Sequence, residues 1–139
     1  LAPEYMVDAV AQIKDYPTVS VAWAGYLGLA IACGWDGNWE ACKVAPYSSY
    51  YGPQGFDDMD EQIIQYHVGL SLDSEEAHQL EVAIRSCARL AVNLIYREQI
   101  EPQSPMAFHV FARACKVMYR MGAALQLKRL GYKFEEVLA

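Results

Sequence analysis

The chain contains little cysteine and no excess of proline or glycine. Its 139 residues include 4 Cys, 6 Pro and 9 Gly. No two cysteines have the Cys-x-x-Cys spacing of a zinc or redox motif, and their density is far below that of a disulfide scaffold. The glycine and proline content excludes collagen-like and low-complexity chains. We therefore expect a folded chain with reduced, structural thiols.

Basic residues and catalytic fingerprints are also scarce. The chain carries 11 Lys+Arg against 17 Asp+Glu, a formal net charge of −6, which argues against a general binder of polyanions. It has no P-loop, no Gly-x-Ser-x-Gly and no dinucleotide-binding fingerprint. The pair Glu75 and His78 has di-iron spacing but no second copy. Cys115 and His109 carry no nucleophile signature. We predict no enzyme, no metal and no cofactor.

Apolar residues make up 54% of the chain and charged residues 20%, which indicates a folded core. The length suits one domain over residues 1–139. Helical periodicity dominates, and no segment has a convincing strand pattern. The sequence thus predicts an all-α, single-domain helical bundle of about five helices, with a long aromatic-rich connector.

Three of these helices are amphipathic in pattern. The first is expected over residues 4–15, with its apolar face formed by Tyr5, Val7, Val10 and Ile13. Another is expected over about 59–70, with 69–71 (Gly-Leu-Ser) leading into a break. A longer one is expected from 73 or 74 to about 98. Its Asp73 and Glu76 have capping-box spacing, and its Glu81 and Arg85 can pair one turn apart.

The last helix is expected over 104–130. Ser104 and Pro105 have the order of an N-cap and a first helical residue, and Gly131 is suited to the C-cap. The side expected to face the core is formed by Phe108, Phe111, Cys115, Met118, Tyr119 and Gly122.

A nearly continuous apolar helix is expected from 18 or 19 to 32 or 33. Residues 16–35 carry no charge, a length that could span a bilayer, but they include proline, serine, threonine and glycine. We expect a buried central helix and no membrane partner. Small residues on this helix allow a neighbouring helix to approach closely: Ala22, Gly25, Gly28 and Ala32. The first residues do not form a secretory signal, so we expect a cytoplasmic protein.

The connector, residues 34–57, concentrates aromatic side chains beside acidic ones. Trp and Tyr are frequent at binding hot spots because they bury a large area at low entropic cost. The leading hypothesis is a non-enzymatic regulatory protein that binds a protein partner here, with a homodimer as one form of such an assembly. The alternative is that the aromatics close the open end of the bundle. The candidate residues are Trp35, Trp39, Tyr47, Tyr50, Tyr51, Asp57 and Asp58.

Charge is unevenly distributed along the chain. Residues 1–62 carry nine acidic and two basic residues, whereas residues 104–133 carry six basic residues and no acidic one. A basic stripe is expected on the last helix, with spacing i, i+4, i+7 and i+11: His109, Arg113, Lys116 and Arg120. This stripe can contact nucleic-acid phosphates, pair with the acidic front of the chain, or face solvent.

Four features occur in an order that resembles phage late-gene antiterminators of the Q type. They are Trp35/Trp39, then 46–49 (Pro-Tyr-Ser-Ser), then Asp57-Asp58, then Ser104 opening the basic helix. The resemblance covers about residues 35–127 and implies a DNA-binding transcription regulator that uses the helix over 104–130. Residues 99–103 depart from it, because they lack the glycine-centred turn of a helix-turn-helix. A second alternative is a helical small-molecule binder with an apolar pocket near the central helix.

Overall fold

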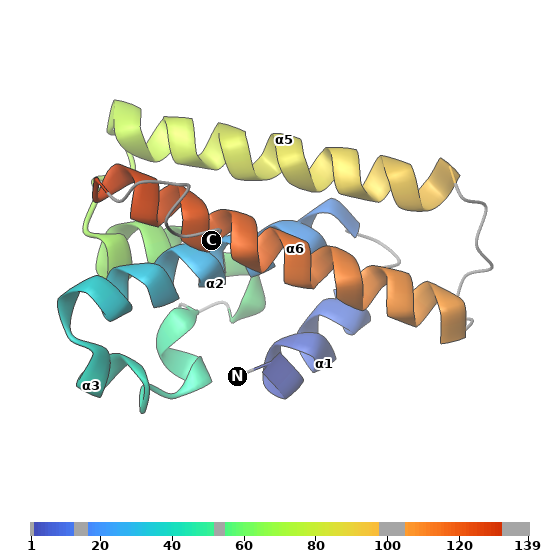
Figure 1. The fold of residues 1–139 in the computed structure, drawn as a ribbon, viewed down its shortest axis with the longest axis horizontal. Helices are drawn as coiled ribbons and strands as arrows, with labels where there is room; N and C mark the ends of the chain where they lie inside the picture. Colours follow the sequence, from blue (N-terminus) through green and yellow to red (C-terminus); the bar gives the residue numbers. More distant parts are fainter. Residues whose placement is uncertain (1, 13–16, 52–54, 98–104, 132–139) are drawn as a thin grey trace.

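The computed structural model describes residues 2–12, 17–51, 55–97 and 105–131 (Figure 1). Most of the described residues are helical, and none of them forms an extended strand, which confirms the all-α fold. The long helices are α1 (Ala2–Gln12), α2 (Pro17–Gly37), α5 (Glu75–Arg97) and α6 (Pro105–Arg129). The short ones are α3 (Trp39–Cys42), the 3-10 turns η1 (Tyr47–Tyr50) and η2 (Phe56–Asp58), α4 (Met59–Gln62) and the π-helix η3 (Ile63–Val68).

Helix α2 lies at the centre and contacts α1, α3, α4, η3, α5 and α6. In Figure 1, α6 crosses in front of α2, α5 lies above both, and α1 and α3 lie below. All ten residues from 21 to 30 are buried. The segment Thr18–Gly37 is long and apolar enough to cross a membrane by length and composition, but 67% of its window is buried by the rest of the chain. That burial is typical of a core helix.

The crossing of α2 and α6 depends on glycine. A methyl group on Gly28 would overlap the carbonyl oxygen of Tyr119 and lie 2.7 Å from the amide nitrogen of Ala123. A methyl group on Gly122 would overlap the carbonyl oxygen of Gly25. The two backbones are therefore in direct contact, which confirms the close approach predicted from the small residues of α2.

The predicted apolar face of α1 was wrong at two positions. Tyr5 and Ala9 are buried, whereas Val7 is 72% exposed and Val10 is also exposed. The Tyr5 hydroxyl donates a hydrogen bond to the carbonyl oxygen of Ser20 and so turns the Tyr5 side of the helix toward α2. Residues two apart on a helix differ by about 200° in direction, so Val7 points away. Ile13 lies outside the described residues.

The central helix is longer than predicted and ends at Gly37, so the connector begins at Asn38. Gly34 lies inside the helix and does not end it. It packs against the Cys42 side chain of α3, where a methyl group would not fit. The true end coincides with Asp36-Gly37-Asn38, residue types that are typical of turns. Asn38 caps α3 by accepting a hydrogen bond from the amide of Ala41 through Oδ1, at 3.2 Å.

Residues 59–70 do not form one regular α-helix. One α-helical turn is followed by the π-helix η3, which buries both Ile63 and Ile64. The segment ends before Gly69, the first residue of the predicted break, whose φ of 82° is the left-handed conformation that glycine favours. The sequence gives no signal for the π-helix, because its core-facing residues also fit an α-helical pattern.

The N-cap of α5 is Ser74 and not Asp73. The Ser74 Oγ accepts a hydrogen bond from the amide of Ala77 at 3.1 Å. The helix begins at Glu75, one residue later than a capping box between Asp73 and Glu76 requires. The predicted pair Glu81–Arg85 is present at 3.3 Å. Gly131, with φ of 94°, ends α6 as predicted, and Ser104 lies outside the described residues.

Candidate functional site

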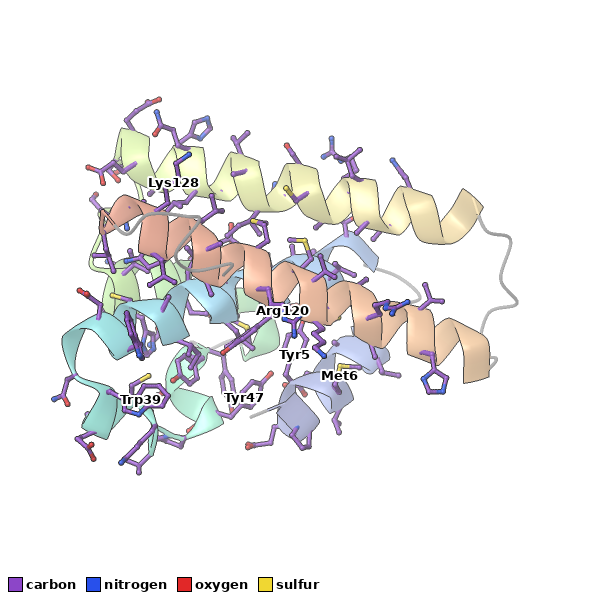
Figure 2. The ribbon with its side chains drawn as sticks, viewed as in Figure 1. Tyr5, Met6, Trp39, Tyr47, Arg120 and Lys128 are labelled. Carbon is purple, nitrogen blue, oxygen red and sulfur yellow. The ribbon has the colours of Figure 1, made fainter. Side chains whose placement is uncertain are left out.

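The two connector tryptophans lie on the surface where α2 ends and α3 begins. Trp35 is 52% exposed and Trp39 is 43% exposed. Figure 2 shows Trp39 beside α3, at the lower left. Asp36 and Glu40, which follow them in the sequence, are exposed as well. We call these four residues the tryptophan corner: Trp35, Asp36, Trp39 and Glu40.

The backbone under the tryptophan corner is held by local contacts. Gly34 lies against the Cys42 side chain, so α3 sits directly on the last turns of α2. The Asn38 cap fixes the first turn of α3, and Lys43 pairs with Glu40 at 2.8 Å. Helices set the direction of their side chains more precisely than an open loop does. The corner therefore presents its two indole rings from a defined backbone.

The tyrosines of the connector point inward instead. Tyr47 and Tyr50 are buried, and Tyr51 is half-buried with its ring edge-on to Tyr47 at 5.5 Å. The Tyr47 hydroxyl donates to Asp8 Oδ2 of α1 at 2.8 Å (Figure 2). Burial, followed by this hydrogen bond, raises the pKa of Tyr47 well above its usual value. The hydroxyl therefore stays protonated and joins the connector to α1.

His67 of η3 holds the other end of the connector. Its ring stacks on Tyr50 with 4.7 Å between centroids, and its Nε2 lies 2.7 Å from the carbonyl oxygen of Ser49. The Cys33 thiol of α2 donates to the His67 carbonyl oxygen at 3.3 Å. Burial and the nearby Cys42 thiol raise the pKa of Tyr50 to about 12. The tyrosines thus close the bundle, while the tryptophans stay outside.

The two remaining connector candidates, Asp57 and Asp58, lie in η2 and lead into α4. Asp57 is exposed and Asp58 is half-buried. The amide of Asp58 donates to the carbonyl oxygen of Gly55 at 3.1 Å, which forms the turn before α4. Their charge lies at a helix start, where the helix dipole favours it. The predicted set is therefore divided among an exposed corner, a buried tyrosine group and a helix start.

The basic stripe of α6 faces solvent. His109, Arg113, Lys116 and Arg120 are all exposed, and Val117 lies exposed among them. No ion pair within the described residues involves Arg113, Lys116 or Arg120. Farther along α6, Arg129 does pair with Glu76 of α5, at 2.9 Å. Pairing with the acidic front of the chain, one of the predicted alternatives, is thus not observed for these three residues.

Cys115 and His109 do not form a catalytic pair. Cys115 is buried and His109 is exposed, on different sides of α6. Burial raises the pKa of the Cys115 thiol to about 12, so at neutral pH it remains a thiol and a weak nucleophile. Its Sγ lies 3.9 Å from the Ser20 carbonyl oxygen, which also accepts the Tyr5 hydrogen bond. Sequence reasoning missed this buried contact because Tyr5, Ser20 and Cys115 come from three helices.

A cleft of about 190 Å³ opens beside α2, as the small-molecule alternative requires, but its walls are largely polar. Three carboxylates and the Tyr26 side chain line it, so it is not the apolar pocket predicted. Within the described residues, no group of three or more His, Cys, Asp or Glu is placed to hold a metal ion.

Comparison with known proteins finds no matching family model, no similar curated protein and no similar solved structure.

Proposed function

We propose that this chain is a non-enzymatic interaction protein that binds a partner protein through the tryptophan corner. The observation that carries the proposal is the exposure of Trp35 and Trp39 on a backbone fixed by α2 and α3. Large aromatic side chains stabilise the core of a single chain only when they are buried. Two half-exposed indoles only four residues apart in the sequence are better suited to contact with a partner.

The charge around the corner defines the chemistry of the partner. Asp36 and Glu40 are exposed beside the indoles, and Lys43 pairs with Glu40. The first 62 residues have a net charge of −7. A partner segment complementary to the tryptophan corner carries an aliphatic or aromatic side chain at its centre and Lys or Arg at its rim. Interfaces combine an apolar core with a charged rim in this way.

A peptide-selection experiment tests this proposal. A displayed library of random peptides is selected on the full chain and then counter-selected on the Trp35→Ala/Trp39→Ala double variant. We expect the retained peptides to be rich in Lys or Arg and in large apolar residues. Each indole truncation is expected to weaken their binding at least tenfold, the loss typical of hot-spot aromatics. The affinity is measured by calorimetry with a synthetic copy of a retained peptide.

Leu90→Ala is the matched control, because Leu90 is also a large exposed apolar residue but lies on α5. It should leave the affinity within about twofold of the wild type, since surface truncations outside an interface are nearly neutral. If the counter-selection on the double variant removes every peptide that binds the full chain, the tryptophan corner is refuted as the binding site.

The basic stripe supports a second candidate function, contact with nucleic acid. Its three fully charged residues are exposed and have no ion pair within the described part of the chain. His109 and Arg120 are eleven residues apart, so the stripe extends about 16 Å along α6, enough to follow several phosphates. The overall charge of −6 requires this contact to be local.

Fluorescence anisotropy with a labelled DNA duplex tests the second candidate. Binding should weaken steeply as the salt concentration rises. It should be abolished in the triple variant Arg113→Gln/Lys116→Gln/Arg120→Gln. Each removed phosphate contact lowers the slope of log affinity against log salt concentration by about one. Arg89→Gln on α5 removes one exposed charge elsewhere and should change little. If the duplex does not bind at low salt, the stripe is only a solvated helix face.

A further inference from the structure

The cleft beside α2 lies on a different set of elements from the tryptophan corner and the basic stripe. Asp60 and Glu61 come from α4, Glu81 comes from α5, and Tyr26 comes from the buried middle of α2. Ile64 and Leu72 add apolar wall. Four oxygen-bearing side chains from three helices therefore converge on one open cleft of about 190 Å³.

Tyr26 is the unusual member of this group. Its side chain is 1% exposed, yet its hydroxyl has no hydrogen-bond partner among the described residues. No fully buried side-chain nitrogen or oxygen in the described structure lacks a partner, so this hydroxyl reaches the cleft. The ring is held edge-on to Trp23, with 5.3 Å between centroids. A fixed and unpaired hydroxyl is thus aimed at the space that the carboxylates line.

The carboxylates leave an excess of negative charge in the cleft. Arg85 reaches Glu81 Oε1 at 3.3 Å and so offsets one of the three. Burial, together with the charges of Glu61 and Glu81, raises the pKa of Asp60 to about 6 in spite of Arg85. The ionised form of Asp60 has too few cationic neighbours, so a cation bound in the cleft would stabilise it.

We propose that the cleft binds an alkylguanidinium cation, with Asp60, Glu81 and Tyr26 as hydrogen-bond acceptors and Ile64 and Leu72 against the alkyl stem. Guanidinium carries five N–H donors in one plane, and it pairs with carboxylates in a forked geometry. Its weak hydration favours a partly buried site. This site goes beyond the proposed function, because it requires neither indole of the tryptophan corner.

Calorimetry or NMR titration of the full chain with n-butylguanidinium tests the proposal. We expect saturable binding with a Kd on the order of 1 mM, as suits so small a ligand. The neutral isostere n-butylurea should not bind, since it has the same shape but no charge. Asp60→Asn should weaken n-butylguanidinium at least tenfold. Tyr26→Phe should weaken it about threefold, which corresponds to one neutral hydrogen bond.

Glu75→Gln is the matched control, because it removes one exposed carboxylate at the start of α5, outside the cleft. It should leave the Kd unchanged. Three outcomes would each overturn the proposal: no binding of n-butylguanidinium, equal binding of n-butylurea, or an equal loss in the Glu75→Gln and Asp60→Asn variants. The last of these would indicate general attraction to an acidic protein.

A capped Gly-Gly-Arg-Gly-Gly peptide identifies the source of the cation. Tighter binding of the peptide than of n-butylguanidinium indicates an arginine of a polypeptide, and weaker binding indicates a free small cation. Either result supports the site, because both ligands carry the same head group. Trp35→Ala/Trp39→Ala should bind n-butylguanidinium like the wild type, which separates this site from the tryptophan corner.

Discussion

Two parts of α2 have similar compositions and opposite environments. Trp23 in the middle of the helix is 5% exposed, whereas Trp35 in its last turn is 52% exposed. The middle is covered by α5, α6 and η3. The end lies against α3 through Gly34, and about half of the Trp35 side chain stays exposed there. Tryptophan therefore lies in the core in the middle of this helix and on the surface in its last turn.

This difference shows that burial is set by neighbouring helices and not by the hydrophobicity of the segment. Residues 21–30 are buried because glycines let α6 approach the α2 backbone, as they do at Gly28. Trp35, one residue beyond Gly34, stays half-exposed although α3 packs against this turn. A hydrophobic residue that is left exposed in this way is informative about binding, whereas a buried one is informative about stability.

The largest expected effect comes from truncating the two tryptophans separately. Trp23→Ala should lower the free energy of unfolding by about 3–5 kcal/mol, because it opens a cavity in the core. Trp35→Ala should lower it by less than about 1 kcal/mol, as surface truncations do. Urea unfolding followed by far-UV circular dichroism measures both. Equal losses would show that Trp35 packs within the core and would remove the basis of the tryptophan corner.

A smaller effect is expected from adding one methyl group to each part of the helix. Gly28→Ala forces the backbones of α2 and α6 apart and should cost about 3 kcal/mol, the upper range for overpacking. Gly37→Ala is the control, because nothing lies within 4 Å of the added methyl group. It should change stability by no more than about 0.5 kcal/mol. A tolerated Gly28→Ala variant would contradict the close crossing of the two helices.

The fold was predictable where a pattern repeats over many turns. The long helix α6 carries enough periodic positions that Phe111, Cys115 and Met118 could be placed in the core from spacing alone. Local pairs such as Glu81–Arg85 were predictable for the same reason. The short helix α1 was not, since its valines and Tyr5 fit competing faces, and only the contact with Ser20 decides between them.

The candidate site was predictable only as a group of residues. The aromatic cluster is visible in the sequence, but its division into buried tyrosines and exposed tryptophans depends on distant partners. Tyr47 bonds to Asp8, 39 positions earlier, and Tyr50 stacks on His67. The cleft has no sequence signal at all, because Tyr26, Asp60 and Glu81 are brought together by three helices.

The smallest expected effect concerns the acids beside the two parts of α2. Asp60 lines the cleft at the buried part, and burial raises its folded-state pKa from 3.8 to about 6. Between these two values the folded state binds more protons than the unfolded state, so the contribution of Asp60 to stability is lost as pH rises from about 4 to 6. Asp60→Asn removes this loss.

The Asp60→Asn variant should therefore gain about 1 kcal/mol over the wild type at pH 7.5 relative to pH 4.5, a value reduced from the full pKa shift because the carboxyl is partly solvated. Asp36→Asn, at the exposed end of α2, removes the same charge and is the control for a general effect of net charge. Urea unfolding at the two pH values measures both variants. If the stability of the two variants changes equally between the two pH values, the burial of Asp60 beside α2 does not set its pKa. The contrast between the two parts of the helix then does not extend to their acidic neighbours.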